Sequence, residues 1–149
     1  MRGLRNNNPL NIRRGRKKWL GEVDSIKGVH DADFCQFQSM EYGYRAAIKT
    51  LLTYQSAHKC KTIREIINRW APLIENNTKA YIARVVKDVN KAQPNAGITA
   101  DTELDLKFDS VTLLNLLCAM MSVENRVKAR EGDYDAAKRA IRMVFHKSV

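Results

Sequence analysis

Apolar residues recur every three or four positions in five stretches of the chain, which is the spacing of one face of an α-helix. The pattern predicts helices over residues 41–58, 62–70, 77–89, 109–124 and 132–145. Their starts carry residues that commonly cap helices: Ser39, Thr62, Asn77 or Thr78, and Asp109 or Ser110. The stretch 109–124 is apolar on most sides, so we expect it to be the central, buried helix.

Residues 5–22 show neither helical nor strand spacing before Trp19. Residues 19–37 combine short apolar runs with turn-forming glycines, which predicts one or two small hairpins. Gly43 stands in the first turn of the helix over 41–58, where it indicates that another backbone passes close by. We therefore expect one domain over residues 1–149, mainly α (α+β), with about five helices and a small N-terminal β element.

The segment RNNNPLNIRRGRKKWLGE, residues 5–22, is unusually rich in asparagine. Polar side chains at this density rarely build a core. The amides of Asn6, Asn7, Asn8 and Asn11 can hydrogen-bond the local backbone and hold tight turns. They can equally present donors and acceptors to a polar ligand, and the sequence leaves both uses open.

The chain carries 26 lysines and arginines against 16 acidic residues, a net charge of +10 with a pI of about 9.7. Residues 1–18 contain many of these cations and no acidic residue. An acidic partner is expected: a cell-wall polymer, a nucleic acid or an anionic membrane surface. The alternative is a basic surface that only aids solubility.

Several classes of chemistry lack support in the sequence. Cys35, Cys60 and Cys118 are too scattered for a disulfide framework or a metal site, and no residue pattern indicates a cofactor. The N-terminus lacks the apolar stretch of a signal peptide, and no apolar run is long enough to span a bilayer. We expect cytoplasmic synthesis and no membrane span.

Carboxylates are the better candidates for chemistry. Glu124 stands at the end of the most apolar predicted helix, in AMMSVEN. Apolar neighbours and the negative end of the helix dipole both raise the pKa of a carboxyl group, as a general acid requires. A solvated glutamate at a frayed helix end is the alternative. Glu22 and Glu75 are weaker candidates, and Trp19, in a basic polar segment, is the best platform for a ligand ring.

The order of motifs resembles a known group of proteins. RNNNPLNIRRG, WLGE, FCQF, EYGYRAAIKTLLTY, TIREIINRW and TLLNLLCAMMSVEN stand in this order over residues 4–125. They resemble small phage and prophage virion proteins, described as structural and suspected of digesting peptidoglycan. The resemblance implies virion or cell-wall association, with other virion proteins as further partners.

NPLNIR, WLG and FCQF also resemble the lysozyme-like superfamily, which includes autolysin glucosaminidases and lytic transglycosylases. There, such a segment follows an apolar helix that ends in a catalytic glutamate. Here the matching helix, ending in AMMSVEN, comes late in the chain. The resemblance implies a circularly permuted lysozyme-like fold, with Glu124 beside residues 8–22 in space. Arg126 departs from the glycine expected after the glutamate, which puts the turn there in doubt.

The resemblance also implies roles for individual residues. Glu124 would be the general acid of a peptidoglycan glycosidase or lytic transglycosylase, and Glu22 a second catalytic acid where water completes the cleavage. The expected substrate-binding residues are Asn7, Asn8, Asn11, Arg13, Trp19, Glu75, Asn76 and Tyr81.

Two alternatives stay open. The first is a non-catalytic virion structural or wall-binding protein that kept the fold and lost the chemistry. The second is a nucleic-acid-binding protein whose basic N-terminal segment lies along phosphates. No recognition helix with basic periodicity supports the second alternative.

Overall fold

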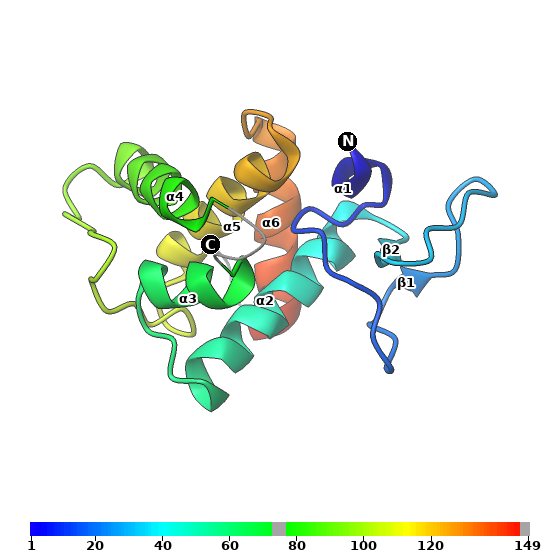
Figure 1. Ribbon diagram of the computed structural model, residues 1–149, viewed down its shortest axis with the longest axis horizontal. Coiled ribbons are helices and arrows are strands. Elements are labelled where there is room, and N and C mark those ends of the chain that lie inside the picture. The colour runs from blue at the N-terminus through cyan, green and yellow to red at the C-terminus, as the bar shows by residue number, and fades with distance from the viewer. Residues whose placement is uncertain (73–76, 147–149) are drawn as a thin grey trace.

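A computed structural model describes residues 1–72 and 77–146, which form six helices and one two-stranded antiparallel sheet (Figure 1). The elements are α1 (Arg2–Arg5), β1 (Glu22–Val23), β2 (Gln36–Phe37), α2 (Met40–Ala57), α3 (Ile63–Trp70), α4 (Thr78–Ala92), α5 (Ser110–Asn125) and α6 (Glu131–Phe145). The mainly helical class with a small N-terminal β element is thus confirmed. None of the helices in the described residues combines the length and apolarity needed to cross a bilayer.

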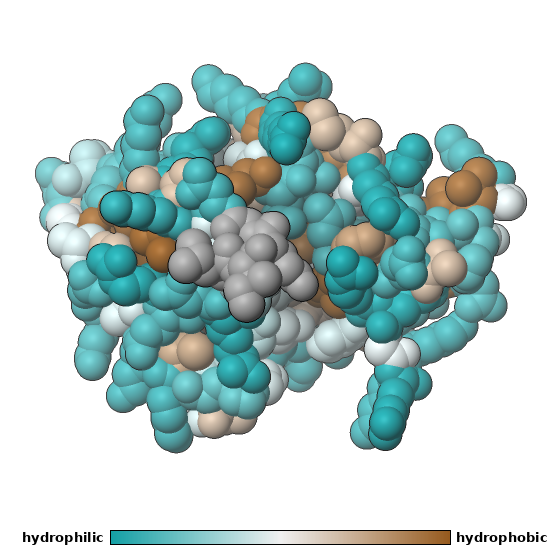
Figure 2. All heavy atoms as spheres, in the orientation of Figure 1, coloured by the Kyte–Doolittle hydropathy of each residue, from teal (hydrophilic) through white to brown (hydrophobic). Residues whose placement is uncertain are grey.

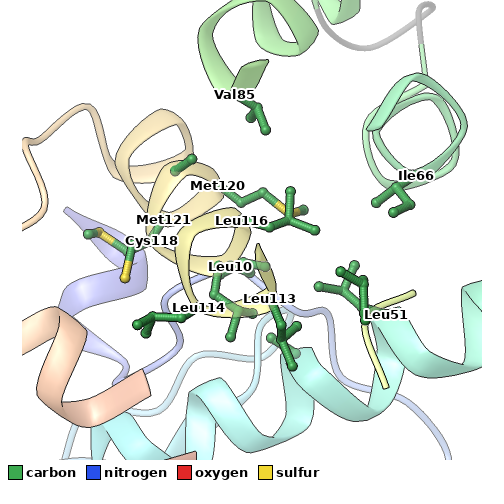
Figure 3. Close-up of a cluster of buried hydrophobic side chains, with 14 of the residues drawn as sticks. Leu10, Leu51, Ile66, Val85, Leu113, Leu114, Leu116, Cys118, Met120 and Met121 are labelled. Atoms are coloured by element: carbon green, nitrogen blue, oxygen red, sulfur yellow. The ribbon is translucent and has the colours of Figure 1, made fainter. Parts of the chain in front are cut away.

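Helix α5 is the centre of the core, as its sequence predicts. Its side chains from Leu113 to Met121 are buried apart from Asn115, and α4 and α6 pack against it. Helix α2 packs on α6, and α3 packs on α4. Figure 3 shows α5 side chains meeting Leu51 of α2, Ile66 of α3 and Val85 of α4 in one cluster.

Side-chain capping bonds mark the starts of α3, α4 and α5, whereas Ser39 precedes α2 without a side-chain capping bond. The Thr62 hydroxyl accepts from the Glu65 N–H, and the Glu65 carboxylate accepts from the Thr62 N–H, completing the capping box. Asp109 caps α5 by accepting from the Thr112 N–H. Helix α4 continues to Ala92, three residues beyond the predicted end at Val89.

The N-terminal segment departs from expectation. Residues 2–5 form α1, which is too short to leave a periodic signal, and Leu10 is 1% exposed within the main core. Figure 3 shows Leu10 among the side chains of α5. A segment that looked too polar for a core therefore inserts one leucine into it.

Gly43 explains how the segment comes so close. A methyl group at this position would overlap the Asn7 carbonyl oxygen and lie 2.6 Å from Pro9 Cδ. The backbone of residues 7–9 therefore crosses the first turn of α2 in direct contact, as the glycine predicts.

The β element pairs Glu22 with Phe37 and Val23 with Gln36. Phe37, Cys35 and Ala46 form a second small buried cluster beneath it. In Figure 1 this part lies to the right of α5, beside α1 and the start of α2.

Candidate functional site

The end of α5 is fastened to the N-terminal segment. The Asn125 side-chain amide donates to the Pro9 carbonyl at 2.8 Å and to the Met121 carbonyl at 3.0 Å. Arg126 then turns the chain with φ 54° and ψ 43°, the left-handed conformation that glycine favours. The sequence placed this turn in doubt, because it has Arg126 where glycine was expected. The turn forms nonetheless, with arginine in the left-handed conformation.

Glu124 lies at this junction, half-buried. Asn11 Nδ2 donates to Glu124 Oε1 at 3.4 Å, which brings together two residues 113 positions apart. Burial raises the pKa of the Glu124 carboxyl, and interactions with Tyr81, Asn11 and Trp70 offset part of that rise. Burial is the largest cause, so the neutral, proton-carrying form is favoured at a higher pH than in an ordinary glutamate.

The carboxyl opens onto a groove of about 730 Å³ between α4 and the end of α5. Its walls combine one acid, several cations and an aromatic ring: Asn77, Tyr81, Arg84, Glu124, Arg126 and Lys128 are among the lining residues. The Tyr81 hydroxyl is buried next to the Glu124 carboxyl and interacts with it. A polar ligand in the groove can therefore find a proton donor in Glu124.

Asn7 and Asn8 serve the fold. Asn8 is fully buried, and its amide donates to the Ile12 and Cys35 carbonyls while accepting from the Ile12 N–H. Asn7 takes φ 52° and donates to the Phe37 carbonyl. The sequence left open whether these amides hold tight turns or bind a ligand. Both side chains hold the turn, and Asn8 in particular has no exposed surface for a ligand.

Glu22 is committed to other partners. Its Oε2 accepts from Arg14 Nη1 at 3.0 Å, its Oε1 accepts from the Trp19 N–H, and its side chain is only 4% exposed. None of the contacts among the described residues joins it to Glu124. The Glu22 carboxylate is therefore held by Arg14 and the Trp19 backbone.

Trp19 and Arg13 do not line the groove. Trp19 is partly buried against the cluster of Cys35, Phe37 and Ala46, which reduces the ring surface it can offer. Arg13 is exposed, with its guanidinium 4.7 Å from the centre of the Phe34 ring. Glu75 and Asn76 fall outside the described residues.

Sequence reasoning missed the cationic wall and the interaction of Trp70 with Glu124. Arg84 follows Tyr81 by three positions and therefore shares its face of α4, so helical spacing could have found it. Arg126 and Lys128 follow the end of α5, where only the tertiary turn places them in the groove. The described residues contain no cluster of histidine, cysteine or acidic side chains able to hold a metal ion.

Fold and site together define a small, basic, mainly helical protein with one half-buried glutamate in a cationic groove. No family model matches the chain. The chain is similar to Protein P5 of Pseudoalteromonas phage PM2, with 33% identity over 148 residues, covering 97% of this chain and 82% of P5. The chain belongs to the family of this phage protein.

Proposed function

We propose that this protein is a phage glycosidase or lytic transglycosylase that acts on peptidoglycan, with Glu124 as the general acid. The observation that carries the proposal is the half-buried Glu124 carboxyl, whose pKa is raised, on a groove of about 730 Å³. A protonated carboxyl in this position can donate its proton to the bridging oxygen of a glycosidic bond. Asn11 orients the carboxyl through its side-chain amide.

The surroundings of Glu22 favour the transglycosylase among these two reactions. Hydrolysis requires a second carboxylate within about 10 Å of the acid to activate water or attack the sugar. The Glu22 carboxylate is instead neutralised by Arg14 and holds the Trp19 turn. In a lytic transglycosylase, Glu124 protonates the leaving oxygen as the bond from C1 to that oxygen breaks. The resulting Glu124 carboxylate then takes the proton of the muramic acid 6-hydroxyl as this oxygen bonds to the same C1, so no second carboxylate is required.

The contacts at the end of α5 support a circularly permuted lysozyme-like arrangement. The hydrogen bonds from Asn125 to Pro9 and from Asn11 to Glu124 bring the NPLNIR segment beside the end of α5, where Glu124 stands. In the superfamily that this sequence resembles, the same order is found along the chain.

Clearing of purified peptidoglycan in a zymogram tests the proposal. General acids contribute about 10²–10⁴-fold to rate, so Glu124→Gln should reduce clearing at least about 100-fold. Glu103→Gln changes an exposed acid outside the groove and should clear like the wild type. Circular dichroism shows whether both variants are folded. Full clearing by a folded Glu124→Gln protein would overturn the assignment.

A non-catalytic virion or wall-binding protein is the second candidate, and its support is the membership of a phage protein family. It predicts that the wild type co-sediments with peptidoglycan sacculi and never clears them. The products distinguish the reactions, because a lytic transglycosylase leaves 1,6-anhydro sugar ends and a glycosidase leaves reducing ends.

A further inference from the structure

A second hollow lies between α4 and α5 and continues the Glu124 groove. It has a volume of about 520 Å³ and is lined by residues that include Lys87, Lys91, Asn115 and Tyr134. Arg84, Ser122 and Lys128 line both hollows. The two hollows therefore adjoin, and together they are called the trough, which extends from Glu124 along α4 toward Lys91, between helices that pack side by side (Figure 1).

Cations dominate this trough. Arg84, Lys87, Lys91, Arg126 and Lys128 line it and are exposed. Among the described residues, Arg84 pairs with Asp88 at 2.9 Å, and no ion pair engages the other four. Lys87 and Lys91 are four positions apart and share one face of α4. Repulsion between them is relieved by anions, so the trough is suited to an anionic ligand.

We propose that the trough binds the carboxylates of peptide stems carried by a glycan strand whose sugars lie at Glu124. This inference rests on the proposed function, because the strand must enter the Glu124 groove to place its stems along α4. Each stem presents free carboxylates beside the sugar backbone, and Lys87, Lys91 and Lys128 can each pair with one. A DNA duplex is the competing occupant, because its phosphates could pair with the same lysines, and its binding is one outcome of the test below.

Hydrophilic residues cover most of the face that Figure 2 shows. The large apolar side chains that are more than half exposed in the described residues are Met1, Leu20, Val29, Phe108 and Val111, and none of them lines the trough. Charge is the property by which this trough can recognise a ligand.

Binding measured on the Glu124→Gln background tests the inference without turnover. The trough variant carries Lys87→Gln, Lys91→Gln and Lys128→Gln. The control variant carries Lys27→Gln, Lys49→Gln and Lys61→Gln, which remove the same charge from exposed sites outside the trough. The probes are glycan strands that retain their peptide stems, neutral chitohexaose and a DNA duplex, each measured in 50 mM and 500 mM NaCl.

We expect the trough variant to bind stem-bearing strands about tenfold more weakly at low salt, since each exposed ion pair contributes roughly a factor of two. The control variant should lose much less, and 500 mM NaCl should remove the difference. Chitohexaose should bind both variants equally. A loss for chitohexaose equal to that for stem-bearing strands would overturn the inference, because it would show damage to the sugar site.

The remaining outcomes separate the two proposals. If the wild type clears peptidoglycan and the trough variant still binds stem-bearing strands normally, the inference is wrong and the proposed function stands. If the wild type never clears peptidoglycan but stem binding depends on the trough lysines, the chemistry fails and the binding site stands. DNA that binds more tightly than the strands and loses affinity in the trough variant would overturn the inference in favour of nucleic acid.

Discussion

At the scale of single residues, Glu124 and Asp31 show how opposite surroundings move carboxyl groups in opposite directions. Glu124 loses water without gaining a cation, and its pKa rises. Asp31 accepts from Arg2 at 2.6 Å and from the Asn6 amide, and these bonds hold the pKa of Asp31 far below its usual range. The Glu124 carboxyl therefore holds its proton to a higher pH than an ordinary glutamate does, whereas the Asp31 carboxyl loses its proton at a lower pH than an ordinary aspartate.

The raised pKa of Glu124 predicts a pH-dependent cost in stability. The folded state holds this proton to a higher pH than the unfolded chain does. Between the two pKa values the folded state therefore binds more protons, and the free energy of unfolding falls as pH rises. The stabilising contribution of this proton is fully present below the pKa of Glu124 in the unfolded chain, about 4.3. It is lost above the pKa of Glu124 in the folded protein.

Chemical denaturation of wild type and Glu124→Gln from pH 4 to pH 8 measures this effect. The wild type should lose stability relative to the variant as pH rises from about 4.3. Taking the difference between the two proteins cancels Asp31, whose lowered pKa adds stability over acidic pH with the opposite sign. A difference that is constant with pH would show that the Glu124 carboxyl is solvated. Cleavage should decline over the same rise in pH, because the general acid must be protonated.

At the scale of elements, the site is assembled by close approach between α2, α5 and the N-terminal segment. Gly43 lets the backbone of residues 7–9 lie on α2, and Asn125 fastens Pro9 to the end of α5. These two contacts fix where Asn11 can reach Glu124. The geometry of the site therefore depends on residues that never touch a ligand.

Gly43→Ala should destabilise the protein by about 2 kcal/mol, in the range of overpacked core sites. The added methyl group would overlap the Asn7 carbonyl, which belongs to backbone and cannot rotate away. Gly132→Ala is the matched control, because it also lies in the first turn of a helix but has open space around its Cβ position. It should be neutral or stabilising by up to about 1 kcal/mol. Equal effects in thermal or chemical denaturation would refute the close approach.

At the scale of the whole molecule, the N-terminal segment is an integral part of the core. Leu10 is buried in the cluster formed by α2 to α6, whereas Leu20 of the same basic segment is 58% exposed. The segment therefore combines a buried anchor with a charged outer surface. Its folding is coupled to that of the helices.

Leu10→Ala should lower the free energy of unfolding by about 3 kcal/mol, because it removes a buried side chain and leaves a cavity. Leu20→Ala should change it by less than about 0.5 kcal/mol. Coincident denaturation curves from tryptophan fluorescence and circular dichroism would show the segment and helices unfolding together. A small effect at Leu10 with separate transitions would show that the segment docks loosely.

The sequence by itself determined most of the helical architecture. Apolar spacing and caps such as Thr62 and Asp109 act over a few residues, so helices α2 to α6 were predicted to within a few positions. The apolar character of α5 on most sides identified it as the buried centre. Glu124 was singled out for the same reason, since its place at the end of that helix is a local property.

The tertiary structure alone decided what surrounds Glu124. The contacts from Asn11 to Glu124 and from Asn125 to Pro9 join residues more than 110 positions apart, which no local pattern specifies. The same packing assigned Asn8 to the fold, tied Glu22 to Arg14 and placed Arg126 and Lys128 on the groove. The neighbours of a side chain across the core depend on how all the helices pack. For these residues, that packing decides whether the side chain supports the fold or lines the site.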